Sequence, residues 1–189
     1  MNIALSWDLF LVVFFVIIVA YSFIVGISKN LKILISAYIS ILVADGFSEI
    51  LRKYFFSAEP LIPIFREGED DTFVIFKITI FIIFMVLLVI RGNYSVNISF
   101  QKGGFLAWFS NALFGFLNAG IIMATILRYV SGASFIRGQG ESVNSIIFDI
   151  YNQSYLVKGM VDNYHVWFSL PAIIFVALSL FFFDPARED

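Results

Sequence analysis

The chain alternates between long apolar runs and short polar connections. Five runs of 18 to 23 residues cover 99 of the 189 residues, and they are residues 9–27, 31–51, 73–90, 105–127 and 166–183. An α-helix needs about 20 apolar residues to cross the hydrocarbon core of a bilayer, so each run has the length of a transmembrane helix. The pattern therefore predicts an all-α, multi-pass protein of a cell membrane, with five transmembrane helices in one membrane domain, residues 1–189.

The first run has to be distinguished from a cleavable signal peptide. Ala20-Tyr21-Ser22 loosely resembles a cleavage site. However, no Lys or Arg precedes the run, Asp8 stands at its start, and the apolar stretch continues to Ile27. A signal peptide has a basic start and a shorter apolar core. We therefore interpret this run as a retained transmembrane helix.

The connections suggest how the helices follow one another. Ser28-Lys29-Asn30 is the only polar stretch between the first two runs, and it predicts a tight turn and an antiparallel hairpin. The connection of residues 52–72 contains two prolines and an acidic cluster, residues 67–71. This cluster is better explained as a solvated loop before the next helix than as a cation site, because acidic residues suit the positive N-terminal end of a helix dipole.

The longest connection contains a different pattern. Val143, Ile146, Ile147 and Ile150 recur at helical spacing, with polar residues on the other faces. This pattern predicts an amphipathic helix, about residues 143–157, that lies on the membrane surface or packs over the helical bundle. A second short helix is expected around Tyr155–Val161.

Composition narrows the class of function. Hydrophobic residues make up 60% of the chain and charged residues 14%. The net charge is −2, and the basic residues form no stripe that would indicate nucleic-acid binding. There is no cysteine and only one histidine, His165, so no multi-histidine or cysteine-ligated metal site is expected. No enzymatic or phosphate-binding motif is recognisable. The sequence predicts a protein without an enzymatic activity, a cofactor or a nucleic-acid partner.

The distribution of basic residues gives a preferred orientation. Lys29 and Lys32 lie in and beside a very short connection, and such connections are cytoplasmic when they are basic. This density of charge favours an N-terminus on the outside, although the total count of Lys and Arg on the two sides is nearly equal.

Besides Lys32 at the edge of the second run, three charged residues fall within the apolar runs. Asp45 and Glu49 are one helical turn apart in the second run, and Lys77 lies near the start of the third. If these two helices are antiparallel neighbours, Lys77 can meet Asp45 or Glu49. Charges within hydrocarbon are costly, so such residues are candidates for function. The favoured interpretation is a structural ion-pair cluster, and the alternative is a proton or cation relay.

Small and amide side chains recur within two of the runs. They are Ser36, Ser40, Ala44 and Ser48 in the second run, and Asn111, Gly115, Asn118 and Ala119 in the fourth. Small residues four apart allow helix backbones to approach closely in lipid, and amides form hydrogen bonds between helices. These two faces are predicted to seal the bundle or its oligomer, rather than to bind a ligand.

The order of these parts resembles the CvpA family, the colicin V production proteins of bacterial inner membranes. The resemblance rests on Trp7-Asp8 at the start, the turn of residues 26–32, the small-residue second run, the Asn111–Gly115–Ala119 series with Gly120, and Ser154-Tyr155-Leu156. The chain departs from the family in lacking its Arg-Gly-Phe turn and in having a fifth run. The resemblance implies a role in envelope maintenance or toxin export and supplies no catalytic residues.

These observations favour a non-enzymatic, CvpA-like inner-membrane protein. Its expected partners are the lipid bilayer and either further copies of the chain or other membrane subunits. The alternative is an ion- or proton-conducting subunit of a transport complex that uses Asp45, Glu49 and Lys77. An enzyme acting on lipid is a weaker alternative, because its chemistry would depend on Asp and Glu alone.

Overall fold

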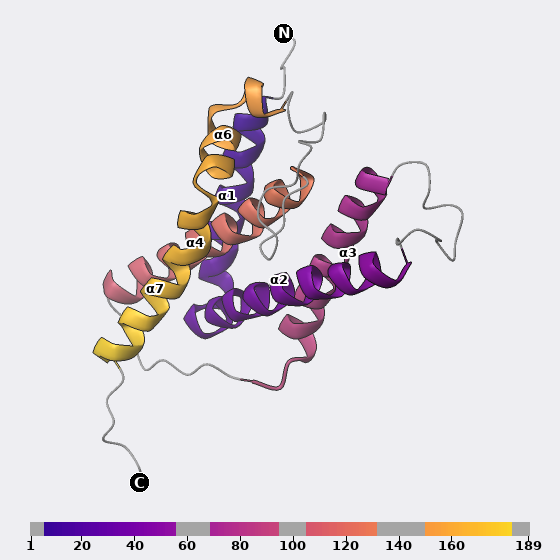
Figure 1. Cartoon of the computed structure of the whole chain (residues 1–189). Helices are drawn as coiled ribbons and strands as arrows, with labels where there is room; N and C mark the ends of the chain where they lie inside the picture. The colour runs from indigo at the N-terminus through magenta and orange to yellow at the C-terminus, as the bar shows by residue number, and fades with distance from the viewer. Residues whose placement is uncertain (1–5, 56–68, 95–104, 132–149, 183–189) are drawn as a thin grey trace.

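The computed structural model describes residues 6–55, 69–94, 105–131 and 150–182, and almost all of them are helical. The helices are α1 (Trp7–Val25), α2 (Ile27–Phe55), α3 (Glu69–Arg91), α4 (Phe105–Val130), α6 (Tyr155–Asp162) and α7 (Tyr164–Phe182). The start of α1 and the end of α7 lie at opposite ends of the molecule (Figure 1). The all-α, polytopic prediction is confirmed.

Four helices, α1 to α4, are long and apolar enough to cross a membrane. Helices α6 and α7 are long and apolar enough only when they are taken together, and they are bent by 66° relative to each other. Within the described residues, length and composition therefore give four spans, or five if the bent pair counts as one.

The core of the bundle is built around α4. Its apolar span is 72% buried and it contacts α1, α2, α3, α6 and α7, whereas the spans of α1 and α3 are only 11% and 17% buried. The outward faces of α1 and α3 consist largely of exposed Val, Ile, Leu and Phe side chains. A continuous apolar surface of this extent is unfavourable in water and suits lipid.

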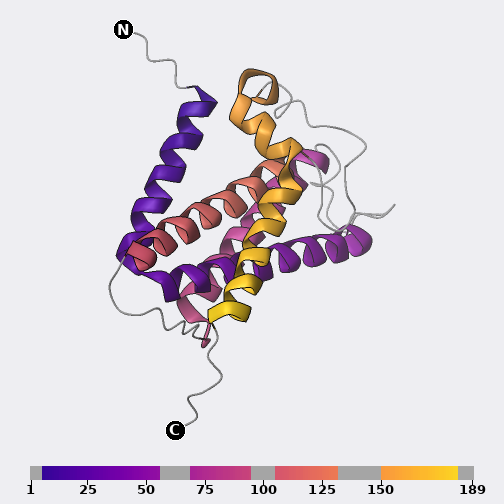
Figure 2. The ribbon, with the colours of Figure 1, turned by 90° about the vertical axis from the view of Figure 1, so that its left-hand side faces the viewer.

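The chain changes direction between α1 and α2 at one residue, Gly26. Its φ of 79° lies in the left-handed region that favours glycine. The predicted turn at Ser28-Lys29-Asn30 is wrong, because these residues form the first turn of α2. The predicted hairpin is wrong as well, since the two helices diverge from Gly26 and α1 packs mainly along α4 (Figure 2).

Helices α2 and α3 are antiparallel neighbours. At one end, the Lys32 ammonium donates a hydrogen bond of 2.8 Å to the carbonyl of Gly92, just after α3. The same ammonium lies 5.4 Å from the centre of the Tyr94 ring, and the Tyr94 and Ser36 hydroxyls are 2.5 Å apart. These contacts join the start of α2 to the end of α3.

A proline lies within α7. Pro171 has no N–H to donate to the carbonyl of Trp167, four residues earlier in the helix. The carbonyl of Phe168, three residues earlier, accepts a hydrogen bond from the Tyr38 hydroxyl of α2. The rings of Tyr38 and Phe168 also meet edge to face, with centroids 5.1 Å apart. The hydrogen bond and the ring contact join α7 to α2 in the turn before the proline.

The amphipathic helix predicted over residues 143–157 is only partly within the described residues. Residues 143–149 lie outside them, and residues 150–153 are helical. A continuous helix to residue 157 is wrong, because Ser154 has an extended backbone and its hydroxyl accepts the N–H of Val157 as the N-cap of α6. The second short helix, expected around Tyr155–Val161, is α6.

Candidate functional site

An ion pair joins α2 to α3 within the bundle. The Lys77 ammonium lies 2.5 Å from a carboxylate oxygen of Asp45, and both residues are almost completely buried. Asp45 is six residues, about 9 Å, before the end of the apolar span at Leu51. It faces inward because it lies on the same face of α2 as Ile41 and Ser48, which are also buried.

The end of α4 completes the charged cluster. The Tyr129 hydroxyl donates a 3.4 Å hydrogen bond to the carbonyl of Ile41, one turn before Asp45, and the Lys77 ammonium lies 4.6 Å from the centre of the Tyr129 ring. The neighbouring Arg128 is 5% exposed, and its guanidinium lies 3.5 Å from the centre of the Tyr164 ring at the start of α7. Residues from α2, α3, α4 and α7 therefore converge at one end of the bundle.

The cluster is balanced in charge. Glu49 is half-buried and attracts the Lys77 ammonium, while Arg128 repels it. With both acids and both bases ionised, Asp45, Glu49, Lys77 and Arg128 sum to zero. Each buried charge has an opposite charge or an aromatic face close by, which lowers the cost of keeping it in the membrane. The arrangement can hold four helices together, and its carboxylates and amine are groups that can also exchange a proton.

Two members of the cluster, Arg128 and Tyr129, were not predicted as site residues. They follow the apolar run that ends at Leu127, so the hydropathy pattern places them in a connection. In the structure α4 continues to Val130, and both residues lie in its buried last turn. A usable signal was the helical spacing of Leu117, Ile121, Thr125 and Arg128, which continues one buried face of α4.

The small-residue face of α2 is turned into the bundle. Ser36, Ser40, Ala44 and Ser48 are each 0% exposed. The hydroxyls of Ser36 and Ser40 donate hydrogen bonds of 2.8 and 2.7 Å to carbonyls one turn earlier in α2, Lys32 and Ser36. Ser36 and Ser40 thus bond within their own helix, and all four side chains are small. The face therefore allows α3 and α4 to pack closely against α2.

The predicted face of α4 meets α1 and the start of α2. The Ser22 hydroxyl donates a 2.7 Å hydrogen bond to the carbonyl of Asn111, and the Asn30 amide donates one of 3.0 Å to the carbonyl of Ser22. The Asn118 amide in turn donates a 3.0 Å hydrogen bond to the carbonyl of Asn30. This chain of bonds fixes the end of α1 and the first turn of α2 against α4.

Two glycines mark where α4 touches its neighbours most closely. A Cβ on Gly115 would lie 2.5 Å from the Ser22 hydroxyl and 3.1 Å from the Cα of Val19 in α1. A Cβ on Gly120 would overlap the Trp167 ring of α7. Ala119 beside it is fully buried. Both sides of the α4 face are thus occupied by helices of the same chain.

The described part of the chain offers no group of three or more His, Cys, Asp or Glu side chains that could hold a metal ion. Comparisons of the chain with family models, curated proteins and solved structures find no match. The site is therefore interpreted from its own geometry.

Proposed function

We propose that the protein is a non-enzymatic, CvpA-like membrane protein that acts in envelope maintenance or toxin export by assembling with itself or with other membrane subunits. The multi-pass helical architecture is the foundation of this proposal. The envelope role comes from the sequence resemblance alone. A protein of this kind works through the shape and surface of its bundle, so its intramembrane polar groups are expected to serve packing.

The observation that carries the proposal is the charge-balanced cluster around Asp45 and Lys77. The two charges are 2.5 Å apart, and the Lys77 ammonium also contacts the face of Tyr129. A buried charge that has its partner within the same chain favours a structural role over a transport role, because moving an ion through the site would require breaking the pair.

The position of the small-residue faces limits where a partner can bind. Ser40 of α2 and Gly115 of α4 are buried against helices of the same chain, so these faces are not available to another subunit. The outward faces of the helices remain, and they carry exposed apolar side chains such as Val16 of α1, Leu42 of α2 and Leu87 of α3. An assembly partner must therefore approach apolar surface, where van der Waals packing rather than polar contact drives helix association in lipid.

Purification of the tagged, full-length chain in a mild detergent tests the proposal. Light scattering should give a protein mass above the 21.5 kDa of one chain, or mass spectrometry should identify membrane proteins in fixed stoichiometry. Val16→Trp on α1 and Leu87→Trp on α3 add bulk to two exposed faces, and the variant that lowers the mass identifies the interface. A monomer without stoichiometric partners would contradict the proposal.

A second candidate function is conduction of protons or cations. The observation that favours it is the convergence of Asp45, Glu49 and Lys77 at one site, since ionisable groups within a membrane commonly mark ion pathways. Glu49 is less buried than Asp45 and lies nearer the end of α2, so it would be the entry point. Purified protein in liposomes should then show a flux that Asp45→Asn abolishes without loss of folding.

A further inference from the structure

The outward face of α6 differs from those of the other helices. Tyr155, Lys158 and Asp162 recur on one side of α6, and all three side chains are exposed. Tyr151 extends this polar face: its hydroxyl donates a 2.9 Å hydrogen bond to Asp162, and its ring lies 5.5 Å from the Lys158 ammonium. Exposed charged groups of this kind are unfavourable in hydrocarbon.

The inward face of α6 is apolar and belongs to the bundle. Val157 and Met160 are buried, and they share a core cluster with Leu11 of α1 and with Met123 and Leu127 of α4. The helix thus covers the seam between the start of α1 and the end of α4. Its two faces have opposite polarity, which is typical of helices at a membrane–water interface.

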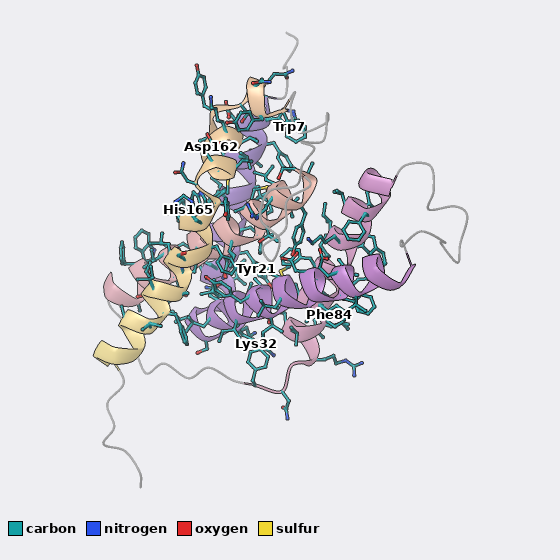
Figure 3. All side chains as sticks on the ribbon, in the orientation of Figure 1. Trp7, Tyr21, Lys32, Phe84, Asp162 and His165 are labelled. Carbon is teal, nitrogen blue, oxygen red and sulfur yellow. The ribbon has the colours of Figure 1, made fainter. Side chains whose placement is uncertain are left out.

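A carboxylate of α1 holds the start of α6 in place. Asp8 accepts a 2.5 Å hydrogen bond from the Ser154 hydroxyl and a 3.0 Å hydrogen bond from the N–H of Leu156. These bonds place the start of α6 level with the first turn of α1. Trp7 and Asp162 lie toward the same end of the molecule (Figure 3). Trp7 is 42% exposed, as expected for a tryptophan at the headgroup level.

The length of α7 makes α6 unnecessary for a crossing. The 19 residues of α7 extend about 28 Å, close to the roughly 30 Å of a bilayer core. The bend of 66° between α6 and α7 falls at Asn163, whose amide donates a 2.9 Å hydrogen bond to the carbonyl of Gly159. The bend therefore separates a helix that can span from one with a charged outer face.

We infer that α6 lies in the phospholipid headgroup layer, tethered by Asp8, and that α7 alone forms the last membrane crossing. The polar face of α6 contacts lipid headgroups and interfacial water. Its apolar face covers the α1–α4 seam. This placement goes beyond the proposed function and does not depend on it, because it concerns the membrane surface of the chain and not its partners.

Cysteine accessibility tests the placement directly, because the chain contains no native cysteine. Lys158→Cys and Ile173→Cys are matched variants, since both positions are exposed on the outside of the protein, on α6 and α7 respectively. A membrane-impermeant maleimide should label Lys158→Cys from one side of sealed vesicles and Ile173→Cys from neither side. Absence of labelling of Lys158→Cys from both sides, or equal labelling of the two variants, would overturn the inference.

The tether between Asp8 and the start of α6 is tested with a cysteine on the buried face of α6. Met160→Cys should react slowly, because the side chain is 5% exposed, and adding Asp8→Ala should raise the rate several-fold. Asp162→Asn, on the outer face, serves as the control and should leave the rate unchanged. Ser154→Ala replaces Asp8→Ala if that variant fails to fold. Slow labelling of Ile173→Cys in the same background shows that α7 still lies in the membrane, and an unchanged Met160→Cys rate would then exclude the tether.

Discussion

Removing the charge of Asp45, the partner of Lys77, is the most direct perturbation of the charged cluster. Asp45→Asn keeps the size of the side chain and removes its charge. The Lys77 ammonium, 4% exposed, then remains within the bundle next to the positive charge of Arg128. Adding Lys77→Met removes the stranded charge and fills the same space with an apolar side chain. The two variants and their combination therefore distinguish a structural pair from a transport site.

The structure sets the expected magnitudes. Removing one partner of a buried ion pair costs about 3–5 kcal/mol, and a charge near the middle of a transmembrane helix costs about 2.5–3.5 kcal/mol on insertion scales. We expect Asp45→Asn to lower the free energy of unfolding by about 3 kcal/mol. The double variant should lie within about 1 kcal/mol of the original protein, since apolar replacement of a buried pair is often neutral. Glu49→Gln, at a half-buried position, should cost less than about 1 kcal/mol.

Unfolding of the purified protein by increasing SDS in mixed micelles, followed by circular dichroism, measures these differences. The same preparations in liposomes are assayed for ion flux. A stable Asp45→Asn variant, or a double variant no more stable than the single one, would refute the structural interpretation. If the stable variant has also lost a flux that the original protein shows, the conducting function takes its place.

Gly115→Ala should lower the free energy of unfolding by about 1–3 kcal/mol in the same assay, because the new methyl group would lie 2.5 Å from the Ser22 hydroxyl of α1. Gly46→Ala is the control, because its methyl group would meet nothing within 4 Å and should leave the stability unchanged. Asn118→Ala removes a 3.0 Å hydrogen bond between helices and should cost about 0.6–2 kcal/mol; no change in the SDS midpoint would mean that the bond contributes nothing. Lys29→Cys and Gly68→Cys should be labelled from opposite sides of the membrane, and labelling from one side would exclude the alternating topology.

The sequence alone determined the class of the protein and the location of most of its membrane helices. Runs of about 20 apolar residues have few alternatives to a transmembrane helix, because lipid cannot satisfy an open backbone. The meeting of Asp45 with Lys77 also followed from sequence, given antiparallel helices, since their positions place them at the same end of adjacent spans. The buried positions of Ser40 and Gly115 likewise match the small-residue pattern.

Tertiary structure decided which helix surfaces meet. The spans of α2 and α4 are less apolar than those of α1 and α3, which matches their greater burial, but α2 and α4 are equally apolar, so hydropathy does not show that α4 is the central helix. The direction of α2 depends on the single φ of Gly26 and on Asn30, whose amide donates to the carbonyl of Ser22 in α1 and whose carbonyl accepts from the amide of Asn118 in α4. The burial of Arg128 depends on its contact with the Tyr164 ring. The break in the helix at Ser154 depends on the carboxylate of Asp8, which is far away in the chain. Such long-range partners are not encoded in local periodicity, and only the packed bundle brings them together.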